Sequence, residues 1–103
     1  MFARVTQFEI DTLRISLNEA LERVKETILP EVQKLPGYCG LYVMRTPEGK
    51  GLAISLWETA EAAQRGVESG YYEAAIANFV MVVKQPPGRD HYEVVISETK
   101  VPA

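Results

Sequence analysis

One apolar stripe near the N-terminus limits what this chain can fold into more than any other feature. Its members recur at steps of four, three, four, four and three, and they are Leu17, Leu21, Val24, Ile28, Val32 and Leu35. This spacing places them all on one side of a helix, which must then cover an apolar surface. Ser16 with Glu19 forms a capping-box pattern that predicts the helix start, and the helix should stop before Pro36. Because Pro30 lacks an amide hydrogen, we expect the helix to kink or tighten near Leu29.

Four other segments have the composition of β-strands, with many β-branched and aromatic residues. They are Phe2 to Glu9, Tyr38 to Arg45, Lys50 to Trp57 and Asp90 to Glu98. The second and third are separated by Thr46-Pro47-Glu48-Gly49, which has the proline and glycine positions that a type I turn prefers. These two segments are therefore predicted to form a hairpin.

A second helical region follows the hairpin in two parts. Thr59 is expected to cap a short helix from Ala60 to about Glu68, and another helix is expected from Tyr71 to Val83. The run from Phe79 to Val83 would also suit a buried strand, and the pattern leaves this alternative open. The order strand, helix, strand, strand, helix, strand predicts a single α+β domain over residues 1–103. Its expected architecture is a ferredoxin-like β-α-β-β-α-β sandwich, an antiparallel four-stranded sheet with helices on one face.

Composition excludes several classes of function. The formal charge of −3 is too small, and of the wrong sign, for binding nucleic acid through its phosphates. The longest apolar runs fall far short of the roughly 20 residues of a membrane helix, and the N-terminus lacks the features of a signal peptide. A single cysteine, Cys39, suits a reducing compartment and is expected to be a small buried hydrophobe. We therefore expect a soluble cytoplasmic protein that binds neither nucleic acid nor membranes.

The predicted strands carry apolar residues on both faces. The third strand directs Leu52, Ile54 and Leu56 to one side and Ala53 and Trp57 to the other. A sheet covered by helices on one face alone should instead alternate apolar and polar residues. Leaving several large apolar side chains in water would cost about 1.5 to 3 kcal/mol each. We therefore expect a homodimer in which the sheet faces of two copies pack together.

Several short motifs resemble the antibiotic biosynthesis monooxygenase family over nearly the whole chain. They are Phe2-Ala3-Arg4-Val5, Ile28-Leu29-Pro30, Pro36-Gly37-Tyr38-Cys39-Gly40-Leu41, the strand from Gly51 to Glu58, and Tyr92-Glu93-Val94. The resemblance implies the dimeric α+β barrel architecture, in which two ferredoxin-like units join their sheets. It also implies one of several activities, because the family includes cofactor-independent oxygenases of polyketide quinones and haem-degrading oxygenases.

Haem degradation is disfavoured by the residues at the matching positions. Haem-degrading relatives use an asparagine, a tryptophan and an iron-ligating histidine where this chain has Gln7, Gly66 and Ile76. Isoleucine has no donor atom for iron. The glycines form no phosphate-binding fingerprint, and the carboxylates Glu19, Glu22 and Glu26 alternate with basic residues on a solvated helix face. We therefore expect neither a cofactor nor a metal site.

The remaining candidate site is a pocket between the sheet and the helices. Asn78 and Tyr72 are the candidate catalytic residues, since the resemblance implies that asparagine and tyrosine side chains surround an aromatic substrate. The candidate substrate-binding residues are Gln7, Trp57, Tyr71 and Phe79. Two functions follow. The first is a small cofactor-independent monooxygenase that acts on an aromatic or polyketide-like molecule. The alternative is a non-catalytic homodimer that binds a hydrophobic small molecule or serves a structural or regulatory role.

Overall fold

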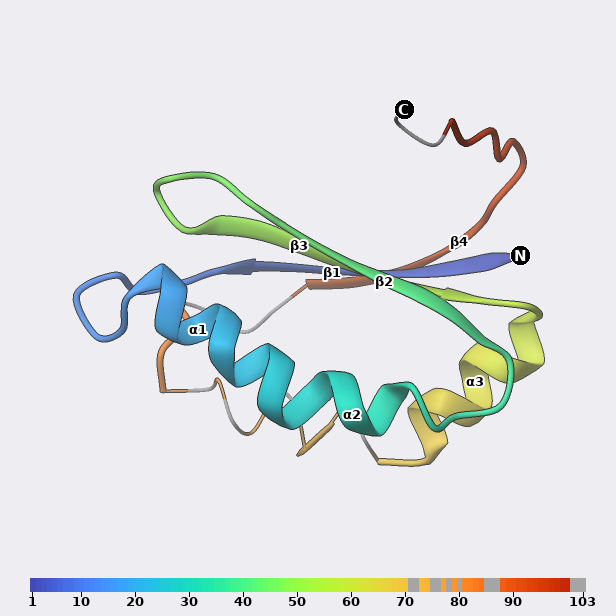
Figure 1. The fold of residues 1–103 in the computed structure, drawn as a ribbon, viewed down its shortest axis with the longest axis horizontal. Helices are drawn as coiled ribbons and strands as arrows, with labels where there is room; N and C mark the ends of the chain where they lie inside the picture. Colours follow the sequence, from blue (N-terminus) through green and yellow to red (C-terminus); the bar gives the residue numbers. More distant parts are fainter. Residues whose placement is uncertain (71–72, 75–76, 78, 80, 85–87, 101–103) are drawn as a thin grey trace.

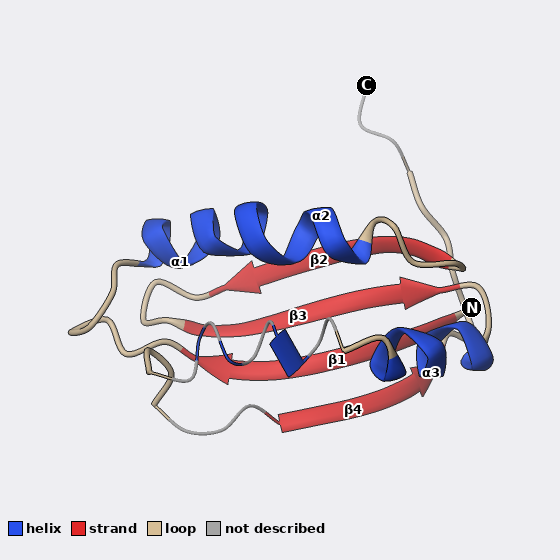
Figure 2. Ribbon diagram, turned by 90° about the horizontal axis from the view of Figure 1, so that it is seen from below, coloured by secondary structure: helices blue, strands red, loops and turns tan. Residues whose placement is uncertain are grey.

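The computed structural model describes residues 1–70, 73–74, 77, 79, 81–84 and 88–100. Four strands form one antiparallel sheet (Figure 1), and their order is β2-β3-β1-β4 (Figure 2). Their bounds are Phe2–Glu9 for β1, Tyr38–Arg45 for β2, Lys50–Trp57 for β3 and Gly88–Glu93 for β4. This is the strand order of a β-α-β-β-α-β sandwich, so the predicted fold class is confirmed.

The described helices lie against one face of this sheet (Figure 2). They are α1 at Leu17–Arg23, the π-helical turn η1 at Val24–Ile28, α2 at Leu29–Val32 and α3 at Ala60–Glu68. Both predicted caps are confirmed. The Ser16 side chain accepts a hydrogen bond from the Glu19 amide at 3.1 Å, and Thr59 accepts one from the Ala62 amide at 3.0 Å. Each cap satisfies an amide that has no partner within its helix.

The first helical segment widens where the sequence predicted a kink or a tightened turn. The Leu29 amide donates to the carbonyl of Val24, five residues back, as in a π-helix. The next residue, Pro30, has no amide to donate, and its ring would clash with the Glu26 carbonyl in a regular α-helix. The expected irregularity is therefore present beside Leu29, but the expectation of a tighter turn is wrong.

Strand β4 is shorter than predicted and begins earlier. It covers Gly88–Glu93, whereas the apolar alternation predicted a strand from Asp90 to Glu98. The ladder ends because β1, its neighbour, begins at Phe2, which pairs with Glu93. One further bond joins the Val94 amide to the Met1 carbonyl at 2.9 Å. The chain beyond has no strand of the sheet beside it and runs away from the helical layer (Figure 1).

The predicted helix from Tyr71 to Val83 lies partly outside the described residues. The described positions 73, 74, 77 and 79 have helical backbone. Val83 instead forms an isolated antiparallel bridge with Ile10. These four described positions thus agree with the predicted helix, whereas the bridge at Val83 agrees with an extended backbone there.

Cys39 is exposed, which corrects the expectation that it is a small buried hydrophobe. The pairing of β2 with β3 shifts between Tyr38 and Gly40, so Cys39 occupies a β-bulge on an edge strand. A bulge rotates the local backbone and re-aims the side chain. The thiol lies 3.5 Å from the Gly37 carbonyl.

Two groups of buried residues fill the space between the layers. The first contains Ile10, Ile15, Ala20 and Val82, and the second contains Val32, Trp57, Ala62 and Ala63. The second group holds α3 against the end of β3, since Trp57 is fully buried there. The helix approaches so closely because Gly66 faces the indole.

Replacing Gly66 with alanine is expected to destabilise the fold by about 1 to 2 kcal/mol, although alanine is the better helix former. A Cβ at position 66 would lie 2.7 Å from Cη2 of Trp57, whose fully buried ring cannot move away. Urea unfolding followed by circular dichroism measures the change. Gln64→Ala, at an exposed position of α3, is the control and should change stability little. Equal or greater stability of Gly66→Ala would contradict this packing.

Candidate functional site

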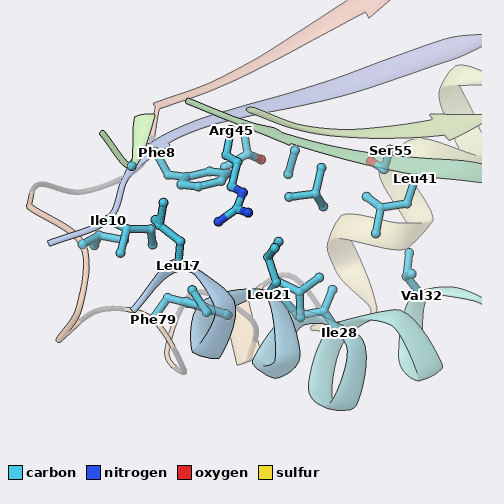
Figure 3. A pocket seen from close by; sticks show the side chains of 17 residues that line it. Phe8, Ile10, Leu17, Leu21, Ile28, Val32, Leu41, Arg45, Ser55 and Phe79 are labelled. Carbon is cyan, nitrogen blue, oxygen red and sulfur yellow. The ribbon is translucent and has the colours of Figure 1, made fainter. Parts of the chain in front are cut away.

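A cavity of about 130 Å³ lies between the sheet and the segment formed by α1, η1 and α2. Figure 3 shows its side chains converging from both layers. The described lining residues are Thr6, Phe8, Ile10, Leu17, Ala20, Leu21, Val24, Ile28, Val32, Leu41, Val43, Arg45, Gly49, Ala53, Ser55, Phe79 and Val83. An engineered apolar cavity of about 150 Å³ holds one benzene molecule, so this space matches a single-ring compound.

The register of the strands explains the roof of the cavity. Ala53 pairs with Thr6 of β1 on one side and with Val43 of β2 on the other, so these side chains point to the same face. The small side chain of Ala53 leaves a hollow in the centre of the sheet, and Ala20 does the same on α1. Five residues of the predicted stripe form the floor, and they are Leu17, Leu21, Val24, Ile28 and Val32. Val24 and Ile28 stand at the two ends of the widened turn. Leu35, the last residue of the stripe, packs against the second core group instead.

Polar side chains are few in this cavity. Among the described lining residues, only Thr6, Ser55 and Arg45 carry polar side-chain atoms. Ser55 is 6% exposed, and its Oγ accepts a hydrogen bond from Nε1 of Trp57 at 3.0 Å. Because that oxygen accepts from the indole, its own hydroxyl hydrogen remains to be donated elsewhere. The cavity can therefore hold an apolar body and offer a hydroxyl to an oxygen atom on it.

Trp57 lies beside the cavity and does not line it. Its ring meets Tyr38 edge to face, with centroids 5.8 Å apart and planes at 76°, and it packs with Val32 and Ala62. Burial raises the pKa of the Tyr38 phenol above its ordinary value of 10.0. The tryptophan thus supports one end of the site through Val32 and Ser55, which do line the cavity.

The structure brings one of the predicted binding residues to the cavity. Phe79 lines it, whereas Gln7 is exposed on β1 between two residues that do. Since successive strand residues point to opposite faces, Gln7 points away from the helices. Tyr71, Tyr72 and Asn78 lie outside the described residues. The roles assigned to all of these residues stay predictions.

The sequence interpretation did not single out Thr6, Ser55 or Arg45. The signal was present in the alternation of the strands. Every second residue of a strand faces the same side, and in β2 Leu41, Val43 and Arg45 are at such alternate positions. This alternation alone would have placed the Arg45 cation on the same face as the two apolar residues.

Two negative findings concern the described part of the chain. Among these residues, no three His, Cys, Asp or Glu side chains come together as a metal site would require. No helix there is long and apolar enough to cross a membrane.

Element order and strand order together define a ferredoxin-like α+β sandwich, and an apolar cavity lies between its layers. Solved structures share this architecture over almost their entire length. A candidate antibiotic biosynthesis monooxygenase from Deinococcus radiodurans has a TM-score of 0.76 at 13% identity, covering 99% of this chain and 100% of that one. SnoaB, a cofactor-independent oxygenase from Streptomyces nogalater, has a TM-score of 0.75 at 12% identity, with 96% and 97% covered.

A protein of unknown function from Nitrosomonas europaea is equally similar, with a TM-score of 0.75, 17% identity, and coverage of 99% of this chain and 94% of that one. No protein-family profile and no curated protein matches the sequence. The resemblance to antibiotic biosynthesis monooxygenases is thus confirmed in the fold, and identities this low establish the fold alone.

Proposed function

We propose that this chain binds a single-ring aromatic molecule in the cavity and oxygenates it without a cofactor. The observation that carries the proposal is the apolar cavity of about 130 Å³ between the layers, with a buried serine hydroxyl on its wall. Likeness in fold to SnoaB, described as a cofactor-independent oxygenase, favours oxygenation as the chemistry.

The proposed reaction needs only the substrate and molecular oxygen. One molecule of a hydroquinone would react with one molecule of dioxygen to give one hydroxyquinone and one water. One oxygen atom enters a new carbon–oxygen bond in place of a ring hydrogen, and the other leaves as water. All four electrons come from the ring, which ends as the quinone. Asn78 and Tyr72 are the proposed residues that stabilise the oxyanion formed when the substrate loses a proton.

A second candidate function is binding without catalysis. It is favoured by the lining itself, because the described residues that line the cavity include no carboxylate, histidine or tyrosine that could exchange a proton with a ligand. The same cavity would then store or sense an apolar molecule.

We further propose that the protein is a homodimer joined through the sheet faces. The face turned away from the helices carries Ala3, Val5, Tyr42, Met44, Leu52, Ile54, Leu56 and Tyr92. The register makes these side chains contiguous, with Ile54 between Val5 and Tyr42. Tyr42 is 58% exposed and Tyr92 is 52% exposed in the single chain. A second copy presents an identical surface and would cover both at once.

Filling the cavity tests the proposed site. Ala53→Leu should place extra carbon atoms in the hollow and weaken binding of hydroquinone by about tenfold or more, because the ring and the new side chain compete for one space. Titration calorimetry measures binding, and an oxygen electrode with product mass spectrometry measures turnover. Ala60→Leu, at an exposed position of α3, is the matched control.

The outcomes separate the two functions. Binding with oxygen consumption and a hydroxyquinone product, both lost in Ala53→Leu, supports the monooxygenase. Binding that Ala53→Leu abolishes, without oxygen uptake for any of a series of hydroquinones, supports the non-catalytic alternative. Equal binding by Ala53→Leu and the unchanged protein would remove the cavity as the site.

A further inference from the structure

Arg45 is the charged side chain of the cavity lining in the described part of the chain. It is the last residue of β2, and its guanidinium extends from the sheet toward the helical layer, near Phe8 and Leu17 (Figure 3). The residue as a whole is exposed, so it lies where the cavity opens to solvent. A cation at this position therefore faces any ligand that enters the cavity.

Among the residues that the structure describes, no carboxylate forms an ion pair with Arg45. Ion pairs among the described residues join Asp11 to Arg14, Glu22 to Lys25, Glu31 to Lys34, and Glu9 to Lys84, and none includes Arg45. A shallow depression outside the cavity shares Arg45, and its other described residues are Thr12, Ser16, Leu17, Asn18, Thr46 and Pro47. No carboxylate is among them. The guanidinium therefore keeps its capacity to pair with an anion.

The apolar walls increase the value of such a pair. An ion pair is stronger beside a surface of low dielectric constant than in open water. Arginine binds carboxylates through two parallel hydrogen bonds, which fixes the orientation of the bound group. A ring that filled the space under Ala53 would place a substituent at the mouth, within the reach of this side chain.

We infer that the cavity selects a single-ring aromatic monocarboxylate, whose ring lies among the apolar side chains and whose carboxylate pairs with Arg45. This inference rests on the proposed binding function and adds the chemical class of the ligand. A neutral ring of the same size would fill the same space without the ion pair.

The test compares benzoate with benzamide, which has nearly the same shape and no charge. Titration calorimetry on the full-length protein should show benzoate binding about tenfold more tightly. Raising the salt concentration should weaken benzoate binding and leave benzamide binding almost unchanged, because ions screen only the charged pair.

Arg45→Met should remove the preference for benzoate while benzamide binds as before, since methionine keeps an apolar stem at the mouth. Arg65→Met, which removes an exposed cation from α3, is the matched control and should keep the preference. Thermal melting of both variants establishes that each is folded.

Equal affinity for the two probes in the unchanged protein would overturn the inference and leave the binding function intact. So would a preference for benzoate that persists in folded Arg45→Met. Failure of both probes to bind would also overturn the inference, whereas the hydroquinone titration decides separately whether the cavity binds a ring.

Discussion

Replacing Trp57 with alanine is expected to lower the free energy of unfolding by about 3 to 5 kcal/mol. The side chain is 0% exposed and joins α3, α2 and the start of β2 through Ala62, Val32 and Tyr38. Its removal would leave a cavity and would also break the hydrogen bond to Ser55. Since small domains are stable by only about 5 to 15 kcal/mol, a large part of the total would be lost. Urea unfolding followed by circular dichroism measures the change.

A second substitution separates the packing from the hydrogen bond. Trp57→Phe keeps an aromatic ring and loses the indole N–H, so it should cost less than Trp57→Ala. If the bond to Ser55 matters, Trp57→Phe and Ser55→Ala should together cost less than the sum of their separate effects. Leu13→Ala, at a 97% exposed position outside the strands, is the control for loss of an apolar side chain. A loss below about 1 kcal/mol in Trp57→Ala would contradict the central role of this side chain.

The elements of this fold were predictable where local chemistry decides them. The periodic stripe, the caps Ser16 and Thr59, and the Pro-Gly turn each act within a few residues, and all three predictions are confirmed. The turn is closed by a bond from the Gly49 amide to the Thr46 carbonyl at 3.1 Å. Strand β4 was predicted less well because its end depends on where β1 begins, which is information about a distant segment.

The candidate site was predictable in position and less so in composition. Its location between sheet and helices followed from the fold, and so did the inclusion of Phe79. The binding role of Trp57 was drawn from its aromatic character, but α3 and Gly66 enclose that ring on the side of the second core group. Packing between two elements decides such a question, and no local pattern in the sequence encodes it.

Introducing a charge at the centre of the open sheet face is expected to convert the proposed dimer to monomers. Ile54 lies in the middle strand pair, flanked by Val5 and Tyr42. The charged residues on that face lie at its margins, Glu9 and Lys50 at one end and Asp90 on the edge strand β4 beyond Val5. In Ile54→Lys the ammonium group would meet its own symmetry mate in an apolar interface, where an unpaired charge costs several kcal/mol. Sedimentation velocity should give twice the chain mass of 11.5 kDa for the unchanged protein and a single chain mass for the variant.

Leu13→Lys provides the matched control, because Leu13 is a 97% exposed apolar residue outside the strands. It introduces the same charge without reaching the proposed interface, so its sedimentation should equal that of the unchanged protein. A folded Ile54→Lys that still forms dimers would place the interface elsewhere on the molecule. An unchanged protein that sediments as a single chain at every concentration would show that the open face tolerates water, because its strand residues are half-buried by their own neighbours.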